Sequence, residues 1–508
     1  MLRRTTLACL LLVLAACVLR LHGMDGQLGD HDTWRQIETA SIARNFLGDP
    51  SILWPRINWG EPGPGYVEAE FQLYPFVVHL LYRLLGEDPW LGRALSVVLF
   101  ALSCLPFHRL ATRWLGPNGI VFATAVYSFS PVLFRFTRTF MPEATVVLAA
   151  MVAVERFVAW VDEGRRGQLL VSALAMAVAV LVKPTSVHLG LVLVVLAAWR
   201  HGTGFLRRAD LWLFAAVALL PAAAWYAHAA VIHATHGNTF GVVSGGDSKW
   251  GNFAWWTNPQ FYKDLLTMEV ARGSGRLGAL FCLAGLPLLA TTGPRAVFRP
   301  LVWSWVVATA VYYLAAARYC GHPDRGLHYH VYAVPMLALL AGAGLDRLCR
   351  GRVATLLACV AATAAVLELV RVDLHVKSLR HPTVTRECGE RLAELSAPAD
   401  RVLVLSPDDA VDRSLGAPVP NNFEQPDVFF HARRKGRLLA RDRQTVEDLA
   451  AEVARFGPRW YVHRPSCAAD GAAGASFRAA LEQQLVLRAT GTDWELWEFR
   501  PAGSGTPR

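Results

Sequence analysis

Long apolar runs separated by short polar connections fill the first three quarters of the chain. A membrane-spanning helix needs about 20 apolar residues, and on that measure the pattern predicts about eleven spans. They lie near residues 5–22, 92–112, 118–136, 143–161, 168–183, 185–200, 210–230, 276–292, 300–317, 330–347 and 352–371. The run 71–86 is also apolar, but it is short and contains Arg83, so we expect a membrane-surface or re-entrant helix there, or a further span.

Two of the long connections, 23–91 and 231–275, have patterns of their own. In the first, apolar residues recur at helical spacing, as in a helix lying in the membrane interface: Ile37, Ala40, Ile42, Ala43 and Phe46. The second contains an aromatic set that suits the headgroup level of a membrane and would equally line a sugar or lipid groove. Its members are Trp250, Trp255, Trp256, Phe261 and Tyr262.

The pattern changes after residue 371, where charge increases and no spanning run is present. The tail alternates predicted strands and helices, which indicates a small α/β domain. Strands are predicted over 401–405 and 459–463, a closing strand pair over 485–499, and helices over 445–456 and 477–484. The basic run Arg433-Arg434-Lys435 is typical of a solvated face. We therefore divide the chain into a membrane domain, 1–371, and an extracytoplasmic domain, 372–508.

Composition agrees with an α-helical polytopic membrane protein. Hydrophobic residues make up 54% and charged residues 18% of the chain, and the mean hydropathy is +0.31. The formal charge of +10 does not indicate nucleic acid, because the Lys and Arg clusters fall in every second connection. The positive-inside rule then predicts a multi-pass protein of the cytoplasmic (inner) membrane. Its N-terminus and uncleaved first helix begin in the cytoplasm, and its long loops and C-terminal domain lie outside.

The nine cysteines show no CxxC motif and no metal-ligand spacing. Cys388 and Cys467 both fall in the tail, in the compartment where disulfides form. The sequence leaves a bridge between them open.

Charged residues near the outer membrane face are candidates for chemistry, because an ionisable group at membrane depth is costly and usually functional. Asp30 and Asp32 directly follow the first predicted span. Asp32 has the position of a helix cap. Either residue would also serve as a general base, and the two together would hold a divalent cation.

Three more charged residues, Arg138, Glu143 and Lys183, lie at the outer ends of predicted spans. Snorkelling towards water explains many such residues. Lys183 differs, because it comes after a fully apolar run and precedes Pro184 on the side where positive charge is sparse. A phosphate group on that side would satisfy it.

The outer loop 318–330 concentrates two arginines and three histidines. They are Arg318, Arg325, His322, His328 and His330. Such a group facing outwards fits an anionic headgroup better than a core. A zinc site is the weaker alternative, because the spacing of the three histidines is not a familiar ligand pattern.

The order of these features resembles the GT-C superfamily of polyprenyl-phosphate-sugar glycosyltransferases, near the protein O-mannosyltransferases and the lipid A aminoarabinose transferases. The features are a first helix, an outer loop with an acid and Trp34-Arg35, a proline-rich passage, and Gly-Glu-Asp-Pro-Trp-Leu-Gly-Arg-Ala-Leu-Ser at 86–96. The resemblance covers residues 5–371, and its individual motifs are short.

The resemblance assigns roles to the first loop. Asp32 matches the family's first-loop acid, Arg35 the arginine after it, and Glu70 the acid that ends the loop. Relatives often continue with Lys-Pro where this chain has Phe71-Gln72, and some have Asp-Glu where it has Asp32-Thr33. These departures leave the sugar and the acceptor open.

Later motifs extend the match. Glu143, in Met-Pro-Glu-Ala, is similar to the second-loop acid, within one residue of alignment, and Lys183 matches a lysine of the aminoarabinose transferases. His328-Tyr329-His330 begins a passage similar to the Tyr-and-Pro motif that closes the lipid-phosphate pocket.

These assignments imply an inverting transfer of a sugar from a polyprenyl-phosphate donor to a hydroxyl of a lipid, glycan or protein acceptor. Asp32 would act as the base and Asp30 or Glu143 would orient the acceptor. Lys183, with Arg138, Arg318 or the 328–330 group, would stabilise the departing phosphate. No nucleotide is needed, and no nucleotide-binding fingerprint is present. A transporter or flippase of a lipid-linked sugar is the alternative, although no related halves are apparent; a non-catalytic scaffold is a third.

Overall fold

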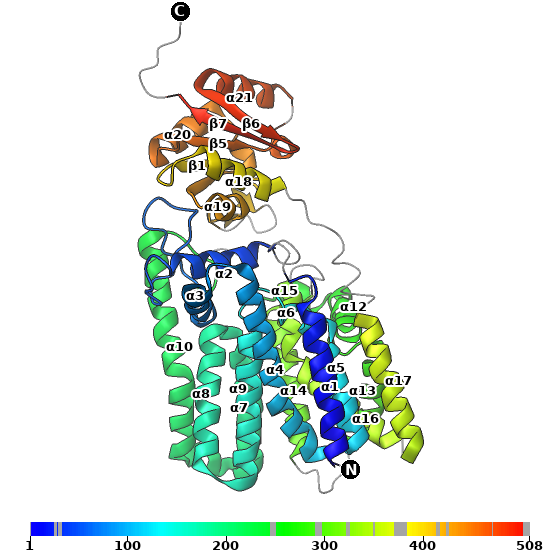
Figure 1. The fold of residues 1–508 in the computed structure, drawn as a ribbon. Coiled ribbons are helices and arrows are strands. Elements are labelled where there is room, and N and C mark those ends of the chain that lie inside the picture. Colours follow the sequence, from blue (N-terminus) through cyan, green and yellow to red (C-terminus); the bar gives the residue numbers. More distant parts are fainter. Residues whose placement is uncertain are drawn as a thin grey trace, which may run out of the picture. The chain divides into compact units, whose positions relative to one another are not determined.

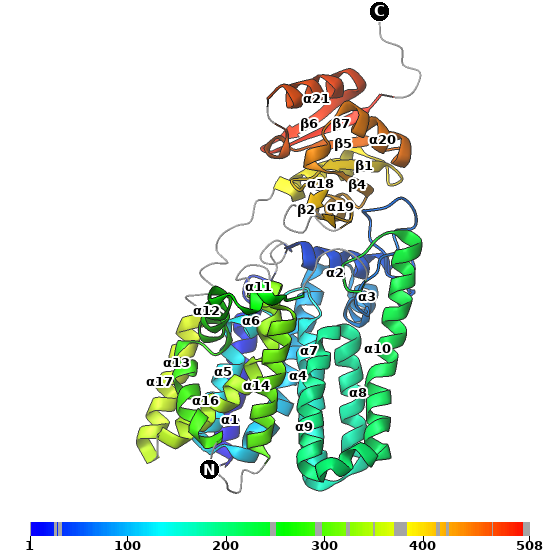
Figure 2. The same ribbon diagram turned by 180° about the vertical axis from the view of Figure 1, so that it is seen from behind.

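The computed structural model describes residues 2–24, 28, 33–243, 250–289, 297–321, 326–348, 351–369, 384–412, 417–422, 426–469 and 471–500. These residues form many helices and a five-stranded sheet (Figures 1 and 2). Contacts divide the chain into two compact units. The helical unit contains 1–27, 88–225 and 248–379, and the sheet unit contains 28–87, 226–247 and 380–508.

Every predicted span contains a helix. The long helices are α1 (Leu2–Leu21), α4 (Pro89–Trp114), α5 (Pro117–Phe129), α6 (Pro131–Phe136), α7 (Glu143–Glu163), α8 (Arg166–Val182), α9 (Leu189–His201), α10 (Ala209–His236), α13 (Arg276–Gly285), α14 (Phe298–Ala315), α16 (Val334–Leu348) and α17 (Gly351–Leu369). In the described chain, five stretches are long and apolar enough to cross a membrane: Arg3–Leu21, Pro89–Trp114, Glu143–Glu163, Pro184–Arg207 and Ala209–His236. The predicted α-helical polytopic fold is confirmed.

Helix α7 lies at the centre of the helical unit. It packs against α4, α8 and α9, and most of its residues are buried inside the protein. Gly164 ends it with φ of +72°, a left-handed conformation that favours glycine, and α8 begins at Arg166. This short connection makes α7 and α8 antiparallel, so the start of α7 and the end of α8 meet at one end of the unit.

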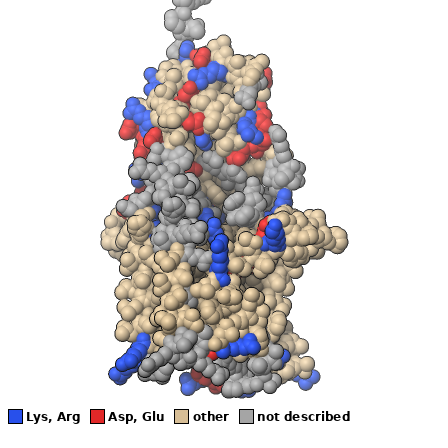
Figure 3. Space-filling view, turned by 90° about the vertical axis from the view of Figure 1, so that its right-hand side faces the viewer, with Lys and Arg blue, Asp and Glu red and all other residues tan. Residues whose placement is uncertain are grey.

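Short elements gather at that same end. Figure 2 shows α6, α11 (Phe253–Trp256) and α12 (Pro259–Met268) there, and Figure 1 shows α15 (Ala317–Cys320). The chain between them forms the π-turn η3 (Glu269–Gly273) and two 3₁₀ turns, η1 (Pro184–His188) and η5 (Leu327–Tyr332). The opposite end carries the start of α1 and many Lys and Arg side chains, and the surface between the two ends is mostly uncharged (Figure 3).

The sheet unit contains the predicted α/β domain. Its sheet has the order β4-β1-β5-β7-β6, in which β4, β1 and β5 are parallel and the β5-β7-β6 part is antiparallel. The strands are β1 (Arg401–Leu405), β4 (Lys435–Leu439), β5 (Trp460–His463), β6 (Leu485–Gly491) and β7 (Trp494–Phe499), beside a small pair, β2 (Val411–Asp412) and β3 (Ala417–Pro418). The helices are α18 (Val384–Leu395), α19 (Asp427–Ala432), α20 (Val446–Phe456) and α21 (Gly471–Gln484). The predicted strands and helices are present; α18, α19, β2, β3 and β4 are additions.

Successive side chains of β1 point to opposite faces of the sheet and belong to two separate hydrophobic cores. Val402 and Val404 pack with Cys388 on one face, whereas Leu403 and Leu405 pack with Cys467 on the other. Both thiols are free and buried. The bridge that the sequence left open is therefore not formed, because the two cysteines lie on opposite faces of the sheet.

Part of the first loop belongs to this unit. The amphipathic stretch is helical as predicted, in α2 (Thr33–Asn45), but its apolar face does not lie in a membrane interface. Ile42 and Phe46 are buried in the core that contains Val404 and Phe429. The next helix, α3 (Leu73–Leu85), packs against α2. The sheet unit therefore contains residues 28–87 in addition to the predicted tail, because the apolar face of α2 is buried in its core.

Ion pairs join the loop to the tail. Arg437, which is 3% exposed, contacts Glu452 (Nε to Oε2, 2.7 Å) and Glu61 (Nη1 to Oε2, 3.0 Å). The expected solvated face at 433–435 is wrong for Arg434, which is buried and donates to the Ser396 hydroxyl (2.9 Å) and carbonyl (2.7 Å). Lys435 is the first residue of β4.

Candidate functional site

The start of α7 and the end of α8 bring Glu143 and Lys183 together. The Lys183 ammonium donates to Glu143 Oε1, and their side chains are 6% and 1% exposed for Lys183 and Glu143 respectively. The other oxygen, Glu143 Oε2, is buried and accepts no hydrogen bond within the described part of the chain. A buried carboxylate held at one oxygen has the other oxygen available to a hydroxyl group.

The turn after Lys183 is fixed by a tyrosine. Ser186 Oγ and Thr185 Oγ1 lie 2.9 and 3.3 Å from the Tyr332 hydroxyl, and the Tyr332 carbonyl accepts from the indole of Trp305 (2.9 Å). His188 stacks on Tyr312 with ring centroids 4.4 Å apart. Elements η1, α14 and η5 thus form one polar and aromatic cluster next to the ion pair.

His330 is fully buried and both its ring nitrogens are engaged. Nε2 lies 3.0 Å from the Cys320 carbonyl, which only accepts, so Nε2 carries a hydrogen. Nδ1 lies 2.6 Å from Glu269 Oε1, which also accepts from the Tyr313 hydroxyl. The distance between Nδ1 and Oε1 is that of a hydrogen bond. His330 therefore has no ring nitrogen left for a phosphate.

Glu269 is a residue that the sequence did not indicate. It begins the π-turn that comes after α12, and its Oε2 is buried without a hydrogen-bond partner among the described residues. A Cβ atom at Gly273 would lie 2.5 Å from Oε2, so only glycine leaves that oxygen its space. π-Turns often mark functional sites.

The structure also places three other residues of the 318–330 loop: Arg318, His328 and Tyr329. His328 is partly exposed and its ring is 4.2 Å from Tyr329 and 5.8 Å from Phe136, between centroids. Tyr329 is buried, and Arg318 is partly exposed on α15. His322 and Arg325 lie outside the described residues. Arg318 and His328 are thus the better placed candidates for an anion.

Arg138 is buried and donates to the His22 carbonyl. A second buried arginine, Arg20, was not predicted. Its guanidinium lies over the ring of Phe100 (3.5 Å to the centroid) and donates to Thr137 Oγ1 (2.8 Å). Both guanidiniums bind α1 and its C-terminal turn to the segment after α6, which structural arginines also do.

In the sheet unit, Arg35 bridges two acids. It contacts Glu38 (3.2 Å) on its own helix and Glu70 at the end of the loop. Glu68 is fully buried and was not predicted. It accepts from the Thr239 hydroxyl and from the Val243 amide (2.6 Å), so it binds the segment after α10.

Asp30 and Asp32, the predicted acids, lie outside the described residues. The structure therefore does not place the predicted base or the predicted cation pair. Among the residues that it does place, no group of three or more His, Cys, Asp or Glu is arranged to hold a metal ion.

The missed residues share one property: each makes its contact far along the chain. Glu269 is 61 residues from His330, and Arg20 is 117 residues from Thr137. The one signal that could have indicated Arg20 is the cost of placing an arginine within the first predicted span.

Part of the chain matches a known protein family. Residues 72–228, which include Glu143 and Lys183, match the family model for dolichyl-phosphate-mannose-protein mannosyltransferase. No curated protein sequence matches the chain. The fold and the family match confirm the predicted resemblance to the GT-C superfamily of glycosyltransferases, and the chain is an integral membrane protein.

The chain is similar in fold to ArnT from Cupriavidus metallidurans. The structure of ArnT bound to undecaprenyl phosphate matches with a TM-score of 0.68 at 16% identity, covering 98% of this chain and 99% of that chain. The apo structure gives 0.66 at 16% identity, covering 96% and 97%. Arabinosyltransferase EmbB from Mycobacterium smegmatis gives 0.40 at 15% identity, covering 75% and 32%.

Proposed function

We propose that the protein transfers a sugar from a polyprenyl-phosphate donor to a hydroxyl of a lipid, glycan or protein, with inversion at the anomeric carbon. The observation that carries this proposal is the buried Glu143–Lys183 pair within the segment that matches the mannosyltransferase model. The ArnT structure with undecaprenyl phosphate supports a polyprenyl-phosphate donor, because ArnT has the same fold.

The proposed chemistry divides the charges by role. Asp32 takes the proton from the acceptor hydroxyl, and the open oxygen of Glu143 or the carboxylate of Asp30 orients that hydroxyl. Positive charge must then stabilise the phosphate as it leaves. Lys183 supplies it beside Glu143, and Arg138, Arg318 and His328 are further candidates. Glu269 restricts His330 to positioning the 327–332 turn. A divalent cation at Asp30 and Asp32 stays part of the proposal.

The proposed location is the cytoplasmic membrane, with the N-terminus in the cytoplasm and the site and sheet unit on the other side. The basic end of the helical unit, which carries the start of α1, supports this orientation.

The test measures release of polyprenyl phosphate from radiolabelled polyprenyl-phosphate sugars by the purified chain in detergent, with crude envelope acceptors supplied. Asp32→Asn should reduce the rate about 100-fold or more while donor binding persists. Lys183→Ala should weaken both binding and turnover. Glu447→Gln, which changes an exposed carboxylate on α20, is the matched control.

Binding of the donor without cleavage by any variant or parent would contradict the proposal and favour a transporter of lipid-linked sugars. Full activity of Asp32→Asn would contradict the assigned base.

A further inference from the structure

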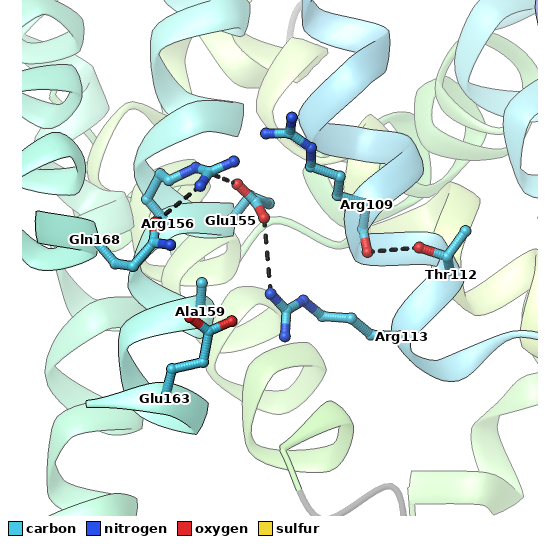
Figure 4. Close-up of a pocket in the computed structure, with 8 residues that line it drawn as sticks. All are labelled: Arg109, Thr112, Arg113, Glu155, Arg156, Ala159, Glu163 and Gln168. Atoms are coloured by element: carbon cyan, nitrogen blue, oxygen red, sulfur yellow. Dashed lines mark hydrogen bonds and ion pairs between the residues drawn. The ribbon is translucent and has the colours of Figure 1, made fainter. Parts of the chain in front are cut away.

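The end of the helical unit opposite the Glu143–Lys183 pair contains a polar cavity. Its volume is about 400 Å³, within the range of small-molecule sites. It is formed by the last turns of α4 and α7 and the first turn of α8. Its lining residues are Arg109, Thr112, Arg113, Glu155, Arg156, Ala159, Glu163 and Gln168 (Figure 4). The proposed transfer of sugar uses none of them.

Most charges in this cavity are already matched. Arg113 contacts Asp162 (2.6 Å) and Glu155 (3.8 Å), and Arg156 contacts Glu155 (2.7 Å) and Gln168 Oε1 (2.8 Å). Glu155 is buried between these two arginines. Three arginines face two glutamates in the lining, which leaves one excess positive charge.

That excess lies on Arg109. Its guanidinium is exposed and makes no ion pair with any residue that the structure describes, and in Figure 4 it extends from α4 towards the same space as Arg156. Glu163, the second acid, contacts Arg165 outside the lining (3.3 Å). The charge of the cavity therefore suits one monovalent anion.

The depth of the cavity favours a lipid as the source of that anion. Helix α7 has 21 residues, so its ends are about 30 Å apart, the thickness of a bilayer core. With Glu143 at one membrane boundary, Glu163 lies at the other, where phospholipid phosphates are. Leu102 and Leu105, both about half exposed, precede Arg109 by two turns and one turn of α4, and they extend the same face towards the membrane centre. An acyl chain would lie against them.

We propose that this cavity binds the phosphate of an anionic phospholipid headgroup, with Arg109 as its principal ligand and the α4 leucines against an acyl chain. The lipid would join α4 to the α7–α8 hairpin and stabilise the unit by binding only its folded form.

The test uses the full chain in detergent, titrated with phosphatidylglycerol and, separately, with phosphatidylcholine of the same acyl chains, and counts bound lipid by native mass spectrometry. Arg109→Gln should weaken phosphatidylglycerol binding about tenfold, the loss of one charge-assisted hydrogen bond. Arg200→Gln removes an exposed arginine from α9, outside the cavity, and should change the affinity less than about twofold.

A second variant, which should strengthen binding, controls for misfolding as the cause of weaker binding. Glu163→Gln removes an acid from the lining and should strengthen phosphatidylglycerol binding about threefold or more, which a damaged fold would not do. Equal binding of phosphatidylglycerol and phosphatidylcholine, no effect of Arg109→Gln, or an equal effect of Arg200→Gln would overturn the proposal.

Inorganic phosphate and glycerophosphoglycerol form the remaining arms. Persistence of phosphatidylglycerol binding in millimolar concentrations of either supports the lipid. If phosphate displaces the lipid and itself stabilises the parent but not Arg109→Gln against heat, the site belongs to a soluble anion and the lipid proposal fails.

Discussion

Buried ion pairs in the two units of this protein connect very different parts of the chain. In the sheet unit, Arg437 joins Glu61 and Glu452, and Glu61 also contacts Arg455, so these charges hold a loop to a tail almost 400 residues away. In the helical unit, Lys183 and Glu143 join α7 to α8, which are already consecutive, packed along their length and linked by a short connection.

The comparison separates structural charges from charges kept for chemistry. The segments that meet at Arg437 lie far apart in the chain, and the ion pairs reinforce the shared apolar core and the backbone hydrogen bond between Gly60 and Gly436 that also join them. Helices α7 and α8 would meet without theirs, and removing two charges from water costs several kcal/mol per ion. A pair that is expensive and unnecessary for packing is a candidate for function, and this is the physical reason for proposing an active site at Glu143 and Lys183.

The largest expected effect comes from breaking the helical pair. Lys183→Met leaves the Glu143 carboxylate buried without its cation, and we expect a loss of about 3–5 kcal/mol in the free energy of opening the helical unit. The measurement is the labelling rate of Cys104, a buried thiol on α4.

The double variant Lys183→Met with Glu143→Gln is its control. It should recover most of the stability, because no unpaired charge remains, and still transfer sugar at least about 100-fold more slowly than the parent. If activity recovers together with stability, the Glu143–Lys183 pair is structural, and it does not differ in role from the ion pairs of Arg437.

Breaking the structural pair should have a smaller effect and a different readout. In Arg437→Met, Glu61 and Glu452 are partly exposed, so water replaces the lost contacts. We expect the free energy of opening the sheet unit to fall by about 2 kcal/mol. Labelling of the buried Cys388 thiol measures it. The rate of transfer per folded molecule should not change. Arg488→Met, at a half-exposed pair on β6, should cost less than about 0.5 kcal/mol.

The smallest effect concerns pH and two groups on α19. Burial raises the pKa of Asp427 to about 6 and lowers the pKa of His431 to about 4. The Asp427 contribution to stability is present below about pH 4 and is lost as pH rises through about 6. The His431 contribution has the opposite sign and is lost as pH falls from about 6.5 to 4. In the parent these slopes oppose each other.

Single substitutions should separate the two slopes. Relative to the parent, Asp427→Asn should gain roughly 1–2 kcal/mol in unfolding free energy between pH 5 and pH 7, and His431→Asn should gain as pH falls over the same interval. The measurement is the unfolding midpoint of the sheet unit at each pH. Identical pH profiles for both variants and the parent would show that neither group titrates as its burial implies.

Much of the fold could be predicted from local pattern. Apolar runs of spanning length predicted the helices, and the short apolar run Val402-Leu403-Val404-Leu405 predicted a strand, which the structure buries on both faces. The pattern did not decide which surface an apolar face covers. Ile42 and Phe46 have the same spacing whether α2 lies on lipid or on protein, and they pack on protein. The basic run at Arg434 likewise concealed a buried side chain in front of a strand.

The site was predictable where a residue was conspicuous by itself. Lys183 interrupts an apolar run, and it meets Glu143 because a hairpin aligns the two ends. Glu269 was not conspicuous, because an acid at the end of an amphipathic helix is common. Its meaning depends on His330 and Tyr313, which arrive from two other elements.

The π-turn at Glu269–Gly273 sets the direction in which the side chains of the preceding helix, α12, face. A π-turn is an α-helical turn with one residue inserted, and each inserted residue rotates the helix before it by about 100° relative to the chain after it. Loss of a single codon here would return the turn to α-helical geometry and point the aromatic surface of α12 in a new direction. A one-residue length change is thus a simple evolutionary route by which relatives of this chain would gain or lose the Glu269 contact.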